Sequence, residues 1–234
     1  MNGVVFYRGI SMLDGMDIVG IATLHSGNRK TGDMVQTWIL RADVEPHTAA
    51  KSGEDQSICG DCPLRTVNGN GACYVLTFQG PRAVYHAWTR GSYPDRTEGT
   101  VYEVDGRSVR LGAYGDPAAI PESAWRQLMV KADRWTGYTH QWRRPEFQYL
   151  RTWCMASCDT IGDVRDAIAL GWGTFYVAAA DADLTRCRVA GRIQIPCPYE
   201  RSGITCDRCG LCAGYTQRNI AVLAHGARAS VITG

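Results

Sequence analysis

The stretch TIGDVRDAIALGWGTFYVAA, residues 160–179, sets the fold class. Its first four residues resemble a helix capping box with Asp163 in the place of Glu, and apolar residues then recur at spacings of three and four until Gly171. Residues 174–179 are an apolar run with a β-branched residue, which is typical of a strand. Together with a strand candidate at residues 147–153, they predict a strand, helix, strand unit with parallel strands and a right-handed crossover.

Strands and helices are also predicted on both sides of this unit. Further strands are expected at residues 3–7, 18–24, 35–40, 72–78, 189–195 and 220–224, with a hairpin of residues 101–104 and 107–111 around Asp105-Gly106. Helices are expected to begin at Pro81 and Pro121. We therefore predict a single compact α/β domain, with strands of the second half arranged in parallel or as a partial barrel. It divides into a β-rich half (about residues 1–112), a helical connector (about 113–146) and a βαβ-type half (about 147–234).

Length and composition exclude several classes of protein. A chain of 234 residues makes one or two domains, and its net charge of +2 excludes both a bulk polyanion-coating protein and a disordered one. The longest uncharged stretch, residues 66–81, is shorter than the roughly 18 to 20 apolar residues of a membrane span. The first residues carry no basic leader or apolar export segment. We expect a cytoplasmic protein that does not enter a membrane.

The most specific motif is CPYERSGITCDRCGLC, residues 197–212. It holds four cysteines, Cys197, Cys206, Cys209 and Cys212, and the last three are separated by two residues each. In a reducing compartment such thiols are expected to bind metal and not to form disulfides. The tight spacing, with a Pro after the remote Cys, favours an iron–sulfur cluster, preferably [4Fe–4S]. Zinc bound by four thiolates is the alternative.

A second cysteine group lies in an irregular loop. Cys59-Gly-Asp-Cys62-Pro-Leu-Arg is followed by Cys73 after a turn rich in Gly and Asn. Three thiolates indicate a second metal centre completed by a distant residue, a cluster with one open iron, or a loop that closes over the first centre. The alternative is a zinc ion that holds the loop, with His25, His47 or His86 as the fourth ligand.

The remaining cysteines are Cys154, Cys158 and Cys187. The first two have the initial spacing of the radical S-adenosylmethionine motif, but Ile161 stands where its third cysteine belongs. Buried apolar thiols are the favoured interpretation. If the strands of the second half are parallel, however, Cys154, Cys158, Asp181, Cys197 and His225 follow their carboxyl ends, which places the C-terminal metal centre at the edge where ligands bind.

Two basic segments are open to more than one interpretation. The turn at residues 26–32 has donors suited to phosphate but not the spacing of a P-loop, and a polar hairpin is favoured. Residues 135–144 combine aromatic and basic side chains that could stack on nucleic acid, but a half-buried strand is favoured.

The cysteine segments, together with residues 27–32, resemble a group of cysteine-rich proteins encoded by bacteriophages. The resemblance rests on Cys59-x2-Cys62-Pro-Leu, on Cys73-Tyr74 and on Cys197-Pro followed by the triple cysteine run near His225. It implies a phage origin, metal-holding cysteine clusters and a C-terminal half similar in layout to the partial barrels of radical enzymes.

These observations predict an iron–sulfur protein with an electron-transfer or redox role, which includes an oxidoreductase. Arg65 and Arg208, close to the cysteines in sequence, are expected to tune the potential of the cluster or bind an anion. The redox partner or small-molecule substrate is left open. The alternative function is a zinc-stabilised binding module for nucleic acid or a host protein.

Overall fold

The computed structural model describes residues 2–185, 187–225 and 229–232. Within them, the main sheet has nine strands in the order β1-β2-β3-β4-β5-β6-β7-β11-β10. β1, β2 and β3 are antiparallel, and every neighbouring pair from β3 to β10 is parallel. The strands are β1 (Gly3–Ile10), β2 (Asp17–Thr23), β3 (Val35–Arg41), β4 (Ser108–Tyr114), β5 (Arg134–Thr139), β6 (Met155–Cys158), β7 (Thr174–Ala178), β10 (Ile195–Pro196) and β11 (Asn219–Leu223).

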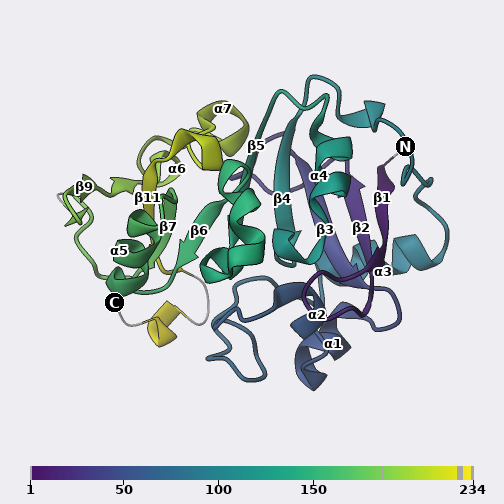
Figure 1. The fold of residues 1–234 in the computed structure, drawn as a ribbon, viewed down its shortest axis with the longest axis horizontal. Coiled ribbons are helices and arrows are strands. Elements are labelled where there is room, and N and C mark those ends of the chain that lie inside the picture. Colours follow the sequence, from purple (N-terminus) through teal and green to yellow (C-terminus); the bar gives the residue numbers. More distant parts are fainter. Residues whose placement is uncertain (1, 186, 226–228, 233–234) are drawn as a thin grey trace.

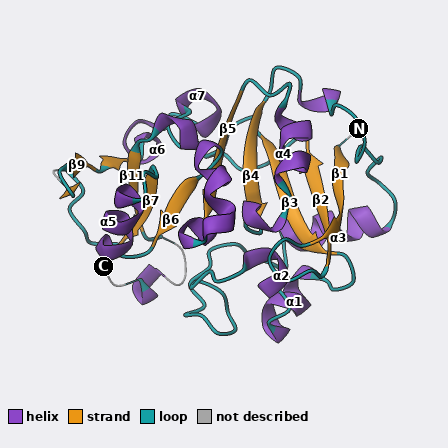
Figure 2. Ribbon diagram, in the orientation of Figure 1, coloured by secondary structure: helices purple, strands orange, loops and turns teal. Residues whose placement is uncertain are grey.

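Helices alternate with the parallel strands, which confirms the predicted α/β class (Figures 1 and 2). The α-helices are α1 (Pro46–Ser52), α2 (Gln56–Cys59), α3 (Gly80–Thr89), α4 (Glu122–Met129), α5 (Ile161–Ala169), α6 (Pro198–Ser202) and α7 (Cys206–Cys209). The 3-10 helices are η1 (Tyr102–Val104), η2 (Pro117–Ala119), η3 (Gln141–Arg143), η4 (Pro145–Thr152), η5 (Gly214–Thr216) and η6 (Ala229–Val231). A separate hairpin joins β8 (Arg188–Val189) and β9 (Arg192–Ile193).

Several predicted elements are confirmed. The first three strands, the helices at Pro81 and Pro121 and the unit of residues 160–179 form as expected. The capping box is complete, because the Thr160 hydroxyl accepts from the Asp163 amide and the Asp163 carboxylate accepts from the Thr160 amide. Among the described residues, no helix is long and apolar enough to cross a bilayer.

Four predicted strands are wrong. Residues 189–195 are broken by the β8–β9 hairpin, where Ala190 and Gly191 have positive φ. Residues 72–78 form no strand, and residues 147–153 lie mostly in η4, where Phe147 and Leu150 are buried at the spacing of one 3-10 turn. The expected hairpin at Asp105-Gly106 is absent from the described chain, since residues 102–104 form η1 and β4 pairs with β3 in parallel. The segment expected to be a helical connector contains β5.

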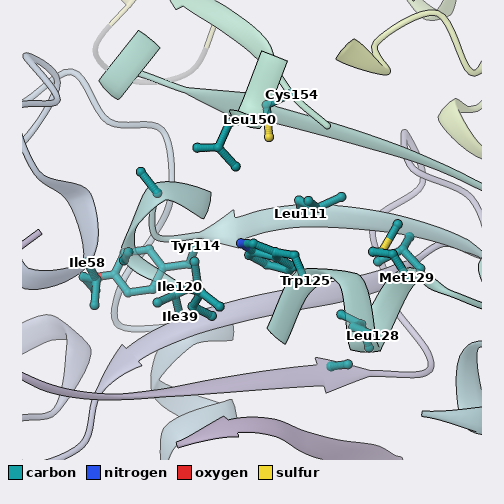
Figure 3. Close-up of a cluster of buried hydrophobic side chains, with 14 of the residues drawn as sticks. Ile39, Ile58, Leu111, Tyr114, Ile120, Trp125, Leu128, Met129, Leu150 and Cys154 are labelled. Carbon is teal, nitrogen blue, oxygen red and sulfur yellow. The ribbon is translucent and has the colours of Figure 1, made fainter. Parts of the chain in front are cut away.

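The main core lies between the sheet and α4. Trp125 is fully buried, and its indole Nε1 donates to the carbonyl of Pro117 at 2.9 Å. Figure 3 shows Trp125 with Leu111 of β4 and with Leu128 of its own helix. Burial of a side chain of this size contributes about 1.5–3 kcal/mol to the free energy of unfolding. This core fixes the positions of β4 and β5. One cysteine group lies near the amino ends of these two strands, and the other lies near their carboxyl ends.

Candidate metal centres

The C-terminal cysteines lie on two short helices that follow β10. Cys197 caps α6, which ends at Gly203, and α7 begins at Cys206 and ends at Gly210. Both glycines have the left-handed conformation (φ 70° and 65°), which L side chains adopt at a cost. The chain therefore turns back twice within 16 residues and carries its four thiols to one place.

All four of these cysteines line a single cavity. Thr136 of β5 and the apolar parts of Tyr199, Ile204 and Leu211 form most of the remaining wall, and Pro198 and Gly210 complete it. Cys197 is buried, and Cys206, Cys209 and Cys212 are half-buried. The cavity thus presents soft sulfur donors in a mostly apolar wall, as metal–thiolate centres require.

The cavity thiols interact electrostatically with one another. Burial raises the pKa of Cys206. The neighbouring thiols of Cys197 and Cys209 raise the pKa of Cys206 further, whereas Arg110 and Lys30 lower it. Burial likewise raises the pKa of Cys212, and a hydrogen bond from the Tyr138 hydroxyl lowers it. Burial is the larger effect, and the resulting pKa is about 12. Cys206 and Cys212 are therefore protonated at neutral pH in the metal-free protein, and metal binding has to release these protons.

This cysteine motif lies near the amino ends of β4 and β5, not at the carboxyl edge that the sequence predicted. The amide of Cys206 donates to the carbonyl of Lys30 at 2.9 Å, just before β3 begins, and Gly210 lies beside Arg134, the first residue of β5. The motif lies there because β10 has only two residues and the chain reverses direction at Gly203, which ends α6. Residues 206–212 then lie near the start of β5.

The basic turn at residues 26–32 packs against this motif. The Asp33 amide donates to Oδ2 of Asp207 at 3.2 Å, and a Cβ on Gly32 would clash with the same carboxylate. Lys30 Nζ lies 3.5 Å from Oε1 of Glu200 and 5.5 Å from the centre of the Tyr199 ring. Sequence reasoning missed this contact because the two segments are far apart along the chain.

The second cysteine group lies in the loop that begins with α2. Cys59 ends that helix, the Cys62 amide donates to the carbonyl of Cys59 at 3.3 Å, and the Cys73 amide donates to the carbonyl of Leu64 at 2.9 Å. Burial raises the pKa of Cys59. Because the Cys62 and Cys73 thiols are close by, they raise the pKa of Cys59 further. Cys73 is an exposed residue, but the protein atoms around its thiol still raise its pKa.

A buried ion pair holds this loop together. Arg65 Nη2 lies 2.6 Å from Oδ1 of Asp55, and the two side chains are only 6% and 5% exposed. The same guanidinium donates to the carbonyls of Gly53 at 2.7 Å and Gly60 at 3.2 Å and also contacts Gln56. Arg65 thus supports the loop and also interacts electrostatically with the Cys59 and Cys62 thiols, whereas Arg208 is exposed.

The second cysteine loop packs at the carboxyl edge of the parallel strands. Asp116 follows β4, His140 follows β5 and Asp159 follows β6. The Asp116 amide donates to the carbonyl of Ile58 at 2.6 Å, and the Gln141 side chain donates to the carbonyl of Cys59 at 3.4 Å. Figure 1 shows α1 and α2 at the bottom of the view and α7 at the top, so the helices that carry Cys59 and Cys206 lie at different ends of the sheet. Tyr74 of the loop nevertheless accepts a hydrogen bond from Arg110 at 2.9 Å, and Arg110 interacts with Cys206.

His140 is the histidine that meets the second cysteine group. Its imidazole interacts electrostatically with the Cys62 thiol, and its Nε2 lies 3.2 Å from Oδ2 of Asp159, without full hydrogen-bond alignment. Burial lowers the pKa of His140, but Cys62 and Asp159 outweigh this effect and raise it well above its usual value. No signal in the sequence marks His140, which is remote from the loop along the chain.

The histidines considered as fourth ligands in the sequence have other neighbours. His47 Nδ1 lies 3.0 Å from the Thr77 hydroxyl, the His86 ring packs against Tyr85, and His25 is exposed. Cys154 and Cys158 are fully buried in the core, where burial raises the pKa of both thiols. Their role as apolar core residues, and not as ligands, matches the favoured interpretation.

The cysteine groups do not stand ready around a single ion. Across residues 2–185, 187–225 and 229–232, no three Cys, His, Asp or Glu side chains are arranged to hold a metal ion as they stand. The four C-terminal thiols therefore share a cavity without converging on one point. In comparisons with known proteins, no family model, no curated protein and no solved structure matches the chain.

Proposed function

We propose that the chain is an iron–sulfur protein in which Cys197, Cys206, Cys209 and Cys212 bind a [4Fe–4S] cluster that transfers electrons. The observation that supports this proposal is that the remote cysteine and the triple cysteine run line one cavity with a mostly apolar wall. A cubane binds each of four thiolates at a separate iron, and the tight spacing of the run is typical of its ligands.

The surroundings of the cavity suit a cluster that carries negative charge. Arg110 and Lys30 are close enough to lower the pKa of Cys206, and the Tyr138 hydroxyl donates to Cys212. Cations and hydrogen bonds to cluster sulfurs stabilise the reduced state and raise the reduction potential. When bound, the cluster would supply one-electron chemistry, and these three side chains would set its potential.

The site is also accessible to a partner. Cys206 and Cys209 are half-buried and belong to α7, a short helix on the outside of the sheet. A cluster held there would lie close to the surface, where a redox partner can dock. We propose electron transfer as the role, with an oxidoreductase activity as its extension if a substrate binds nearby.

The alternative, a zinc-stabilised nucleic-acid module, has less support. Trp142 is buried, and Trp135 packs against Trp153 and Tyr215 at ring-centre distances of 5.1 and 5.3 Å. The aromatic stretch of residues 135–144 is therefore mostly internal and offers no open row of rings for stacking on bases.

Anaerobic purification tests the proposal. We expect a brown protein with about four irons and four sulfides per chain, whose visible absorption bleaches with dithionite. The double variant C206S/C209S should lose this iron, whereas C187S, which replaces a half-buried cysteine outside both groups, should keep it. A colourless protein with zinc bound at these four cysteines would contradict the cluster and support the alternative module.

A further inference from the structure

We propose that Cys59, Cys62, Cys73 and the imidazole of His140 form a zinc site at the carboxyl edge of the sheet. Asp159 orients the imidazole from outside the ligand shell. This site is separate from the C-terminal cavity and does not depend on the cluster proposed there. It joins the long irregular loop to the ends of β5 and β6.

The packing of the Cys59–Cys62 turn against His140 carries the inference. The side chain of Gln141, the residue after His140, donates to the carbonyl of Cys59 at 3.4 Å, and the Cys62 amide donates to the same carbonyl at 3.3 Å. Cys62 and Cys73 both interact electrostatically with the His140 imidazole. Cys59 interacts with Cys62 and Cys73, so the three thiols and the imidazole form one connected group. Rotation about one side-chain bond is enough to move a cysteine sulfur between staggered positions, so closing these donors onto an ion requires no change of the backbone fold.

The arrangement around His140 is that of a metal-bound histidine. Such a histidine usually has a carboxylate at its second ring nitrogen, which fixes the orientation of the ring. Here Nε2 is buried, lacks a well-aligned hydrogen bond and lies 3.2 Å from Asp159. The backbone of His140 is fixed as well, because its amide donates to Oδ2 of the buried Asp116 at 2.8 Å.

The loop is built to present its three thiols to that histidine. Arg65 links the backbone at Gly53 and Gly60, and a Cβ on Gly60 would lie 2.6 Å from Nε2 of Gln141, the residue after His140. Because Gly60 also has a positive φ (54°), a side chain is disfavoured there on two counts. The close approach brings the Cys59–Cys62 turn against the end of β5.

The donor set selects the ion. Three thiolates and one imidazole are a common ligand set of structural zinc, and a cysteine pair separated by two residues is typical of such sites. Residues 72–78 form no strand or helix, and Tyr74, Leu76 and Phe78 are exposed, so the loop has little core of its own. A zinc ion would supply the missing stabilisation.

The test is the zinc content and the zinc coordination of the full chain after anaerobic purification. We expect about one zinc per chain, with X-ray absorption at the zinc edge giving three sulfur neighbours and one nitrogen neighbour. H140A should lose most of the zinc. D159N should weaken zinc binding in a chelator competition by about 10- to 100-fold, the usual effect of removing the partner of a metal-bound histidine.

H47A is the matched control, because His47 belongs to the same region but contacts Thr77. Its zinc content and affinity should equal those of the unaltered protein. Iron and sulfide counted in the same samples separate the two proposals, since H140A should leave the iron of the C-terminal site unchanged. Four sulfur neighbours, zinc content unaffected by H140A, or iron that falls with H140A would each overturn this site. If H140A does not fold, D159N and the zinc-edge spectrum of the unaltered chain decide the question.

Discussion

The two cysteine groups differ in how the fold supports them. The loop of Cys59, Cys62 and Cys73 lies at the carboxyl edge of the parallel strands and is held by a buried ion pair, Arg65 with Asp55. The motif of residues 197–212 lies near the amino ends of β4 and β5 and is held by backbone hydrogen bonds and glycine-ended turns. The first group has a histidine with a carboxylate behind it, and the second has only sulfur donors around a cavity.

The two proposals together imply that similar cysteine spacing does not by itself determine the metal. Both groups contain a pair of cysteines separated by two residues. The elements packed against each pair supply the other donors: His140 for the loop, and Cys197 for the C-terminal motif. We therefore expect zinc at one end of the sheet and a cluster at the other, and the first two of the following three substitutions test how independent the two ends are.

Arg65→Ala should have the largest effect. It leaves Asp55 as an unpaired buried carboxylate, and loss of one partner of a buried pair costs about 3–5 kcal/mol. We expect that loss in the free energy of unfolding from denaturant titration, together with loss of zinc but not iron. Arg208→Ala is the control and should change stability by less than about 0.5 kcal/mol, because Arg208 is exposed. Equal effects of the two substitutions would remove the distinction between the two regions.

Gly32→Ala should act on the other end of the sheet. The residue has φ 65°, and its new Cβ would meet the Asp207 carboxylate beside Cys206. Left-handed backbone costs a non-glycine residue about 1–2 kcal/mol, and we expect a matching loss of stability and faster loss of iron in air. Gly27→Ala places its Cβ in open space and should have little effect. Zinc loss in Gly32→Ala without iron loss would contradict the assignment of the turn to the C-terminal motif.

Asp163→Asn should have the smallest effect, and it depends on pH. Burial raises the pKa of Asp163, but hydrogen bonds from Arg143, Thr160 and the Asp159 amide outweigh it and lower the pKa below its usual value. The stabilisation is therefore present above the unfolded pKa, near 3.8, and is lost as the pH falls through the folded value.

We expect Asp163→Asn to lower the free energy of unfolding by about 1 kcal/mol at pH 7, the usual worth of a helix cap, and by almost nothing in strong acid. Asp166→Asn removes a more exposed partner of Arg143 and should be close to neutral at both pH values. Denaturation of the variants at several pH values measures both. A difference between Asp163→Asn and the unaltered protein that grows as the pH falls would contradict a lowered pKa of Asp163 in the folded state.

Local signals in the sequence predicted the elements whose contacts are also local. The capping box at Thr160 and the apolar runs that form β1, β2 and β3 are of this kind. The failures arise where distant contacts decide. Residues 72–78 have the composition of a strand, but the Cys73 amide bonds to Leu64, close by in the loop, instead of to a sheet neighbour.

The candidate sites divide in the same way. The four C-terminal cysteines could be grouped from spacing alone, because two glycines turn the chain within one segment. His140, Arg110 and the basic turn could not be assigned, because each meets its cysteines only after distant strands pair. The expected position of the C-terminal motif failed for the same reason, since Cys206 bonds to Lys30 across the fold.

The bond from the Cys206 amide to the Lys30 carbonyl has a consequence for biosynthesis. The ribosome releases the β2–β3 connection long before it makes α7. The backbone that receives the C-terminal cysteines is therefore synthesised well before they are. Assembly of an inorganic centre there would be the closing event of maturation.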